Sequence, residues 1–175
     1  MRVFMIIPIL ILCQFSIWAQ NKNTIKSNID SNGELQVELQ LDQQEFQFDQ
    51  YQNWIKSVDH FVSGEIVQVN SEKFVYKGKT LIYLSEKPST FQTELLFTLS
   101  ITQNQKGTKL VLNDIHYKSL PEYGKQGTPA IQTNCQDWFA RKKLYKKSGK
   151  MRTLNQNLMK NSTQFAEKLI LSCLD

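Results

Sequence analysis

Apolar and polar residues alternate along several stretches of the chain, and this alternation predicts β-strands. Every second residue is apolar across residues 35–41, a period of two that indicates a half-buried strand. Residues 94–102 and 109–117 repeat the pattern and predict an antiparallel pair. Because the connection 103–108 contains Gly107, we expect a hairpin loop longer than two residues.

Three shorter stretches between residues 61 and 84 also predict strands. Residues 61–69 are rich in β-branched side chains. Residues 74–76 end at the dipeptide 77–78, Lys-Gly, which predicts a turn. Residues 80–84 predict the next strand, and Glu86-Lys87-Pro88 is expected to end it.

Two regions show the spacing of amphipathic helices instead. An apolar stripe with offsets of three, four and seven residues predicts a helix within residues 43–58. The strongest helix closes the chain, where Ser162 fills a gap in a stripe formed by Met151, Leu154, Leu158, Phe165, Leu169 and Cys173. A shorter helical segment is expected around residues 137–147.

The order of these elements predicts one α+β domain over residues 34–175. Runs of strands with helices set apart favour a curved antiparallel sheet, here of about five strands. The N-terminal strand and the first helix precede most of this sheet, and the C-terminal amphipathic helix packs on one of its faces. Residues 20–33 are polar and are interpreted as a flexible leader.

Residues 1–19 have the pattern of a cleaved export signal. Arg2 precedes an uncharged apolar stretch, residues 3–17, and Ala19 is a small residue suited to the position before the cut. Processing there makes Gln20 the new N-terminus and places the protein in the periplasm or outside the cell.

Two alternatives to a cleaved signal remain open from the sequence. An uncleaved anchor needs about 20 apolar residues, more than this stretch supplies. A lipoprotein would be modified at Cys13, but Leu12 stands where a small residue is required. No later stretch is long and apolar enough to predict a membrane span.

Two cysteines, Cys135 and Cys173, remain after signal removal. Disulfides persist in exported proteins, so we predict that this pair is bonded. The alternative is two thiols too far apart to meet, since a bridge requires Cα atoms within about 7 Å.

The net charge of +5 is concentrated in residues 138–152. This segment contains no acidic residue and seven basic ones: Arg141, Lys142, Lys143, Lys146, Lys147, Lys150 and Arg152. On a helix, these side chains would lie beside aromatic residues and could bind an anionic surface. The plainer interpretation is a solvated helix face whose aromatic residues pack on the sheet.

One cluster of residues has the composition of an acid–base site. Asp114 and His116 share a face if residues 109–117 form a strand, and an Asp–His pair can move protons. No nucleophile motif accompanies the pair, so a polar strand face is the plainer interpretation. His60 and His116 stand at no recognised spacing from each other or from the cysteines for a metal site. We therefore expect no metal, cofactor or catalytic residues.

The order of elements resembles a family of uncharacterised exported proteins of Gram-negative bacteria. The resemblance covers roughly residues 35–172 and includes the helix with Trp54, the hairpin LLFTLSIT…KLVLNDIHY and the closing helix. These proteins carry a domain of unknown function, so the resemblance implies a TATA-box-binding-protein-like fold and no activity. The basic segment 141–152 and the loop before it depart from the family pattern.

Three functional hypotheses follow from the sequence. The first is a non-catalytic exported domain that binds a ligand or partner in the cell envelope through the sheet face left free of helices. The second uses residues 138–152 to bind anionic lipid or polysaccharide. The third, a hydrolase-type enzyme using Asp114 and His116, lacks a nucleophile. Nucleic acid is not expected as a partner, because fold does not imply function and an exported protein does not meet promoter DNA.

Overall fold

The structure is a computed structural model that describes residues 25–42, 48–70, 72–123 and 129–174. Its central element is a seven-stranded antiparallel sheet in the order β1-β2-β6-β5-β4-β3, with β7 pairing beside β2 along the same edge of β6. The strands are β1 (Ile25–Ile29), β2 (Leu35–Leu41), β3 (Ser63–Val69), β4 (Lys73–Tyr83), β5 (Gln92–Asn104), β6 (Gly107–Ser119) and β7 (Gln132–Asn134). The helices are α1 (Phe48–Val58), α2 (Cys135–Phe139), α3 (Arg141–Leu144) and α4 (Thr153–Ser172), with a short 3₁₀ turn, η1, at Pro121–Tyr123.

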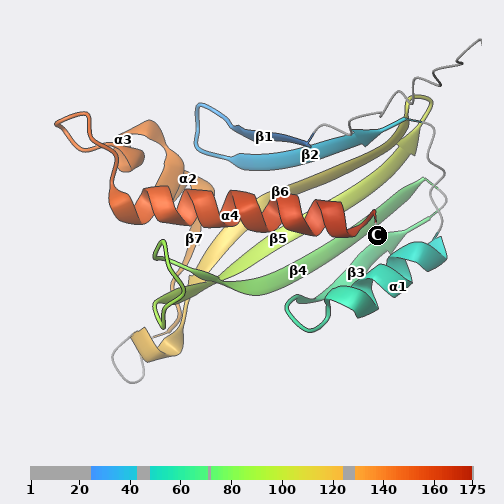
Figure 1. Ribbon diagram of the computed structural model, residues 1–175, viewed down its shortest axis with the longest axis horizontal. Helices are drawn as coiled ribbons and strands as arrows, with labels where there is room; N and C mark the ends of the chain where they lie inside the picture. The colour runs from blue at the N-terminus through green and yellow to red at the C-terminus, as the bar shows by residue number, and fades with distance from the viewer. Residues whose placement is uncertain (1–24, 43–47, 71, 124–128, 175) are drawn as a thin grey trace, which may run out of the picture.

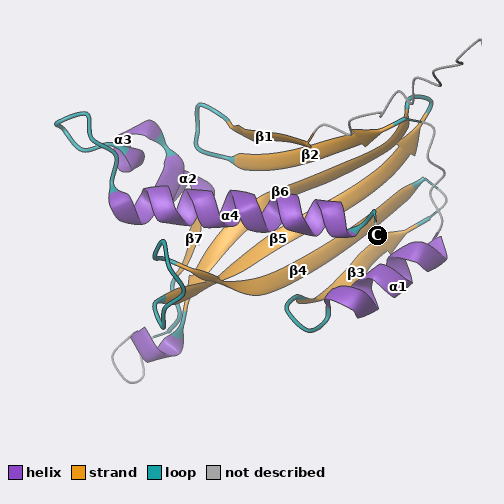
Figure 2. Ribbon diagram, viewed as in Figure 1, coloured by secondary structure: helices purple, strands orange, loops and turns teal. Residues whose placement is uncertain are grey.

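The helices pack against one face of the sheet and leave the other face uncovered. Figures 1 and 2 show α4 lying across the sheet, with α1 near the β3–β4 edge and α2 at the opposite end. Trp54 of α1, Phe139 of α2 and Leu158 of α4 belong to a single buried core with the inward side chains of the strands. The predicted α+β class is therefore confirmed, although the sheet has seven strands rather than about five.

The buried stripe of α4 includes the polar residue that interrupted the apolar pattern. Ser162 is fully buried, donates to the carbonyl of Leu158 (2.7 Å) and shares a hydrogen bond with the Tyr117 hydroxyl (2.8 Å). Leu154 was expected in the stripe but is 37% exposed, while Asn155 is buried in its place. Among the described residues, no helix has the length and apolar character needed to cross a membrane.

Two predicted turns in the sheet were wrong. Gly78 lies within the continuous strand β4, because its missing side chain makes room for two core rings. A Cβ atom there would come within 2.4 Å of the Phe97 ring and 2.7 Å of the Tyr76 ring. The β5–β6 loop is only residues 105–106, and Gly107, with φ +106°, supports this tight connection.

The leader assigned to residues 20–33 was also wrong over its described part. Residues 25–29 form β1 and pair along the whole strand with β2, although only the two end residues of β1 are apolar. Asp30 organises the turn by accepting hydrogen bonds from the backbone N–H groups of Asn32 and Glu34, and these bonds lower the pKa of its carboxyl. Residues 1–24, with the proposed signal, Cys13 and the Ala19–Gln20 cleavage site, lie outside the described residues.

The predicted disulfide is absent, and both cysteines are free thiols. The Cys135 sulfur lies 3.8 Å from the Tyr117 hydroxyl, which is hydrogen-bonded to Ser162 near the middle of α4. Cys173 follows Ser162 by 11 residues, or about 16 Å of helix. The pair therefore lies too far apart for a bridge. Burial raises the pKa of the Cys135 thiol to about 11 and raises that of Cys173 further, so both are poor nucleophiles.

Candidate functional site

A β-bulge in β6 creates the most distinctive feature of the helix-free face. Leu110 and Leu112 are buried at even positions, whereas Ile115 and Tyr117 are buried at odd positions. An extra residue must therefore be inserted between the two halves of the strand. The register against β5 shifts at this point, and Asp114 adopts a φ of +53°.

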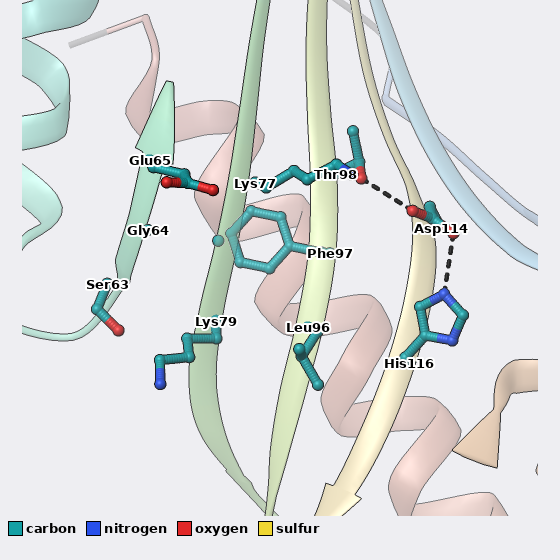
Figure 3. A pocket seen from close by; sticks show the side chains of 11 residues that line it. Ser63, Gly64, Glu65, Lys77, Lys79, Leu96, Phe97, Thr98, Asp114 and His116 are labelled. Carbon is teal, nitrogen blue, oxygen red and sulfur yellow. Dashed lines mark hydrogen bonds and ion pairs between the residues drawn. The ribbon is translucent and has the colours of Figure 1, made fainter. Parts of the chain in front are cut away.

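The bulge holds Asp114 and His116 together, as the sequence predicted. The Nε2 atom of His116 lies 2.9 Å from Asp114 Oδ1, and the Thr98 hydroxyl donates to Asp114 Oδ2 at 3.1 Å (Figure 3). On its other side, His116 Nδ1 lies 2.8 Å from Oδ1 of Asn134, the last residue of β7. The His116 ring is therefore held between Asp114 of β6 and Asn134 of β7. A ring fixed in this way suits a rigid binding surface and suits proton transfer equally.

This cluster borders a shallow hollow of about 490 Å³ that extends across β3, β4, β5 and β6. Figure 3 shows Asp114 and His116 on one side and Ser63 and Glu65 on the other. The lining of the hollow includes the paired glycines Gly64 and Gly78, whose missing side chains would face the core: a Cβ on Gly64 would come within 2.2 Å of the Lys77 carbonyl and 2.8 Å of the Tyr76 ring. A Cβ on Gly78 would likewise meet the buried Phe97 ring, and on the helix-free face the side chains of Lys77 and Lys79 flank this glycine.

The hollow mixes positive and negative side chains. Lys79 forms an ion pair with Glu94 (3.2 Å). Lys77 extends from β4 toward Thr98 in Figure 3, and Glu65 projects from β3. The surface therefore offers hydrogen-bond donors and acceptors side by side, which is chemistry for recognition of a polar partner.

The geometry places no serine or cysteine beside the Asp–His pair among the described residues of the hollow, and the one hydroxyl next to it, that of Thr98, donates its hydrogen bond to Asp114 rather than to His116. Ser63, the serine that lines it, belongs to β3, and His116 belongs to β6. Three strand spacings separate them, or about 14 Å. A general base must lie within hydrogen-bond reach of the group it activates. No three His, Cys, Asp or Glu side chains gather into a metal-binding group within the described part of the chain.

The basic segment lies away from this hollow and does not form the single helix expected over residues 137–147. The helix breaks at Ala140, whose ψ of 139° is extended, so that α2 and α3 are separate. After Leu144 the chain turns back on itself, with Tyr145 bridged to Met151. The seven predicted basic residues are all exposed.

Several residues of the hollow were missed by the sequence analysis. Thr98 and Lys77 in the hollow, and Asn134 beside His116, were not singled out, because their positions depend on pairing between β4, β5, β6 and β7. A detectable signal did exist: the apolar positions of β6 change from even to odd numbers at Asn113 and Asp114. That change of parity within a strand indicates a bulge.

Comparison with solved structures identifies the fold. No family model and no curated protein matches the chain. A DUF4468 family protein from Bacteroides ovatus shares 12% identity with a TM-score of 0.57, over 80% of this chain and 84% of that one. A TBP-like protein from Parabacteroides distasonis shares 15% identity with a TM-score of 0.52, over 82% of this chain and 92% of that one. These similarities confirm the resemblance to an uncharacterised domain family, and at this identity they show its TATA-box-binding-protein-like fold alone.

Proposed function

We propose that the protein is exported to the cell envelope and acts there as a non-catalytic binding domain. Its ligand or partner docks on the helix-free face of the sheet. The observation that carries the proposal is the hollow of about 490 Å³ over β3–β6, which crosses the Gly64–Gly78 pair and is bordered by the bulge at Asp114.

The layout of charges on this face supports a polar partner, such as a protein segment. Glu65 and Asp114 line the hollow on either side of Lys77 and Lys79, and Glu94 pairs with Lys79. Nucleic-acid backbones are bound by uninterrupted positive charge, which this arrangement lacks. The bulge supports a binding role as well, because bulges re-aim side chains at functional sites.

The proposed role is non-catalytic because the serine that lines the hollow lies far from the Asp–His pair. The Asp114–His116 pair is held by Thr98 and Asn134, and the serine of the hollow lies across two intervening strands. Such a pair is suited to holding the bulge and offering hydrogen bonds to a docked molecule.

Photo-crosslinking in cells tests the docking face. A photoreactive residue replaces Lys77 in the hollow or, as a matched control, the exposed Lys56 on α1. The expected result is an adduct of defined mass from position 77 and none from position 56. The same adducts from both positions, or none from position 77, would contradict the docking face.

Mass spectrometry of the protein recovered from cells tests export separately. A chain beginning at Gln20 in the envelope fraction is expected from the apolar pattern of residues 1–19. A chain that retains those residues and stays in the cytoplasm would contradict the envelope assignment.

A further inference from the structure

A second surface, distant from the hollow, is formed by a short hairpin between α3 and α4. Arg152 N–H donates to the Leu144 carbonyl (2.8 Å), and Lys146 N–H donates to the Lys150 carbonyl (2.8 Å). The turn closes with Gly149 N–H on the Lys146 carbonyl (2.9 Å), where Gly149 has a φ of +78°. Residues 144–152, the basic hairpin, therefore have a defined backbone.

The basic hairpin is anchored to the body of the domain. Leu144 is buried at its base. Asn155, buried at the start of α4, donates to the carbonyls of Trp138 (2.6 Å) and Lys143 (3.4 Å). These contacts tie α2, α3 and α4 together, so the backbone that carries the neighbouring cations is held in place.

The cations on this surface form no ion pair with any residue that the structure describes. All seven basic side chains of α3 and the basic hairpin are exposed. Four of them line one shallow hollow: Arg141, Lys142, Lys146 and Lys147. Like charges this close repel one another, and a polyanion relieves that repulsion.

We propose that α3 and the basic hairpin bind the phosphate headgroups of an anionic lipid surface. Five of the seven cations are lysines, which act as point charges and suit a diffuse array of phosphates better than one bidentate ligand. Tyr145 stands among them with 39% of its surface exposed, and tyrosine favours the headgroup region of a bilayer.

The place of the basic hairpin in the molecule fits contact with a surface. Figure 1 shows it at one end of the domain, beyond the end of the sheet. A flat bilayer can touch this end without covering the helix-free face. Lipid binding here is thus a second function, separate from partner docking at the hollow, and it holds or fails independently of that proposal.

Vesicle sedimentation tests the lipid proposal. The processed protein is mixed with vesicles of phosphatidylcholine alone or of phosphatidylcholine with phosphatidylglycerol. Binding is expected only to the anionic vesicles and should weaken strongly as salt rises from about 0.1 M to about 1 M, because the Debye length falls from about 10 Å to about 3 Å.

Two charge variants locate the site. Changing Lys142, Lys143, Lys146 and Lys147 to Gln should weaken binding at least about tenfold, since each lysine near the surface contributes. The matched control changes four exposed lysines elsewhere to Gln and should bind within about threefold of the wild type: Lys26, Lys56, Lys87 and Lys118. Circular dichroism checks that both variants remain folded.

The outcomes separate the lipid surface from other anions. Equal loss in both variants, or equal binding to neutral vesicles, would overturn the basic hairpin as the site. Capture of a soluble anionic polysaccharide without vesicle binding would overturn the lipid assignment. Selective loss in the four-lysine variant, on anionic vesicles only, supports the proposal.

Discussion

The two faces of the sheet differ in their covering and in how strongly a substitution on each should affect stability. The helix-covered face consists of fully buried apolar side chains, including Leu95 and Leu99 of β5, packed against α1, α2 and α4. Their neighbours Leu96 and Thr98 on the opposite face are only partly buried. Packing on the helix-covered face therefore supplies most of the stability. Residues of the helix-free face can change without disturbing that packing.

The largest effect is expected at the centre of the covered face. Leu158→Ala removes a fully buried side chain and should lower the free energy of unfolding by about 2–5 kcal/mol. The matched change Leu154→Ala, in the same helix at a 37% exposed position, should cost less than about 1 kcal/mol. Urea denaturation measures both. Equal losses would contradict the assignment of the buried stripe.

The next largest loss of stability is expected at a glycine whose missing side chain faces the core. Gly78→Ala places a Cβ against the Phe97 and Tyr76 rings, and overpacking should cost about 1–3 kcal/mol of stability. Lys77→Ala, one residue away on the opposite face, is the control and should change stability little. If Gly78→Ala is neutral in thermal unfolding, the close packing under the hollow is not present.

Alkaline pH should lower the stability of the protein, because the thiol of Cys135 is buried in the folded state. The pKa of Cys135 is raised from 9.0 to about 11 by burial, so the unfolded chain ionises first as pH rises. The free energy of unfolding should fall between about pH 9 and pH 11, and below pH 9 this contribution is fully present. Cys135→Ala should remove on the order of 2 kcal/mol of that decline. An unchanged decline in the variant would contradict the burial of the thiol.

The smallest effect concerns backbone strain on the open face. Asp114 has a φ of +53°, a conformation that costs an alanine about 1 kcal/mol more than a glycine. Asp114→Gly should therefore be more stable than Asp114→Ala by about that amount, since both lose the bonds to Thr98 and His116. Equal stabilities in chemical denaturation would show that the bulge relaxes.

The sequence predicted the covered face well because burial imposes periodicity. The alternation in residues 95–101 and the helical stripe around Leu158 and Leu169 correspond to buried positions in the structure. Local patterns failed where tertiary pairing decides the conformation. Strand β1 has few apolar residues and depends on pairing with β2. Gly78 continues a strand because two distant rings occupy its space.

The candidate site could be predicted only in part. Asp114 and His116 are two residues apart, so their shared face follows from strand geometry. Thr98 and Asn134 join them through long-range register, which a single sequence does not reveal. The basic segment was recognised from composition, but its break at Ala140 and its hairpin were not, because Asn155 and the cross-hairpin bonds that hold it come from tertiary contacts.

Protection of the hollow in cells shows whether a partner covers the helix-free face. Lys77→Cys and the control Lys56→Cys are labelled with a maleimide in the purified protein and in intact cells, with the parent chain, whose thiols are both partly or fully buried, as background. We expect fast labelling of both variants when purified and slowed labelling of position 77 alone in cells. Equal labelling of position 77 in both settings would contradict a partner docked on the helix-free face.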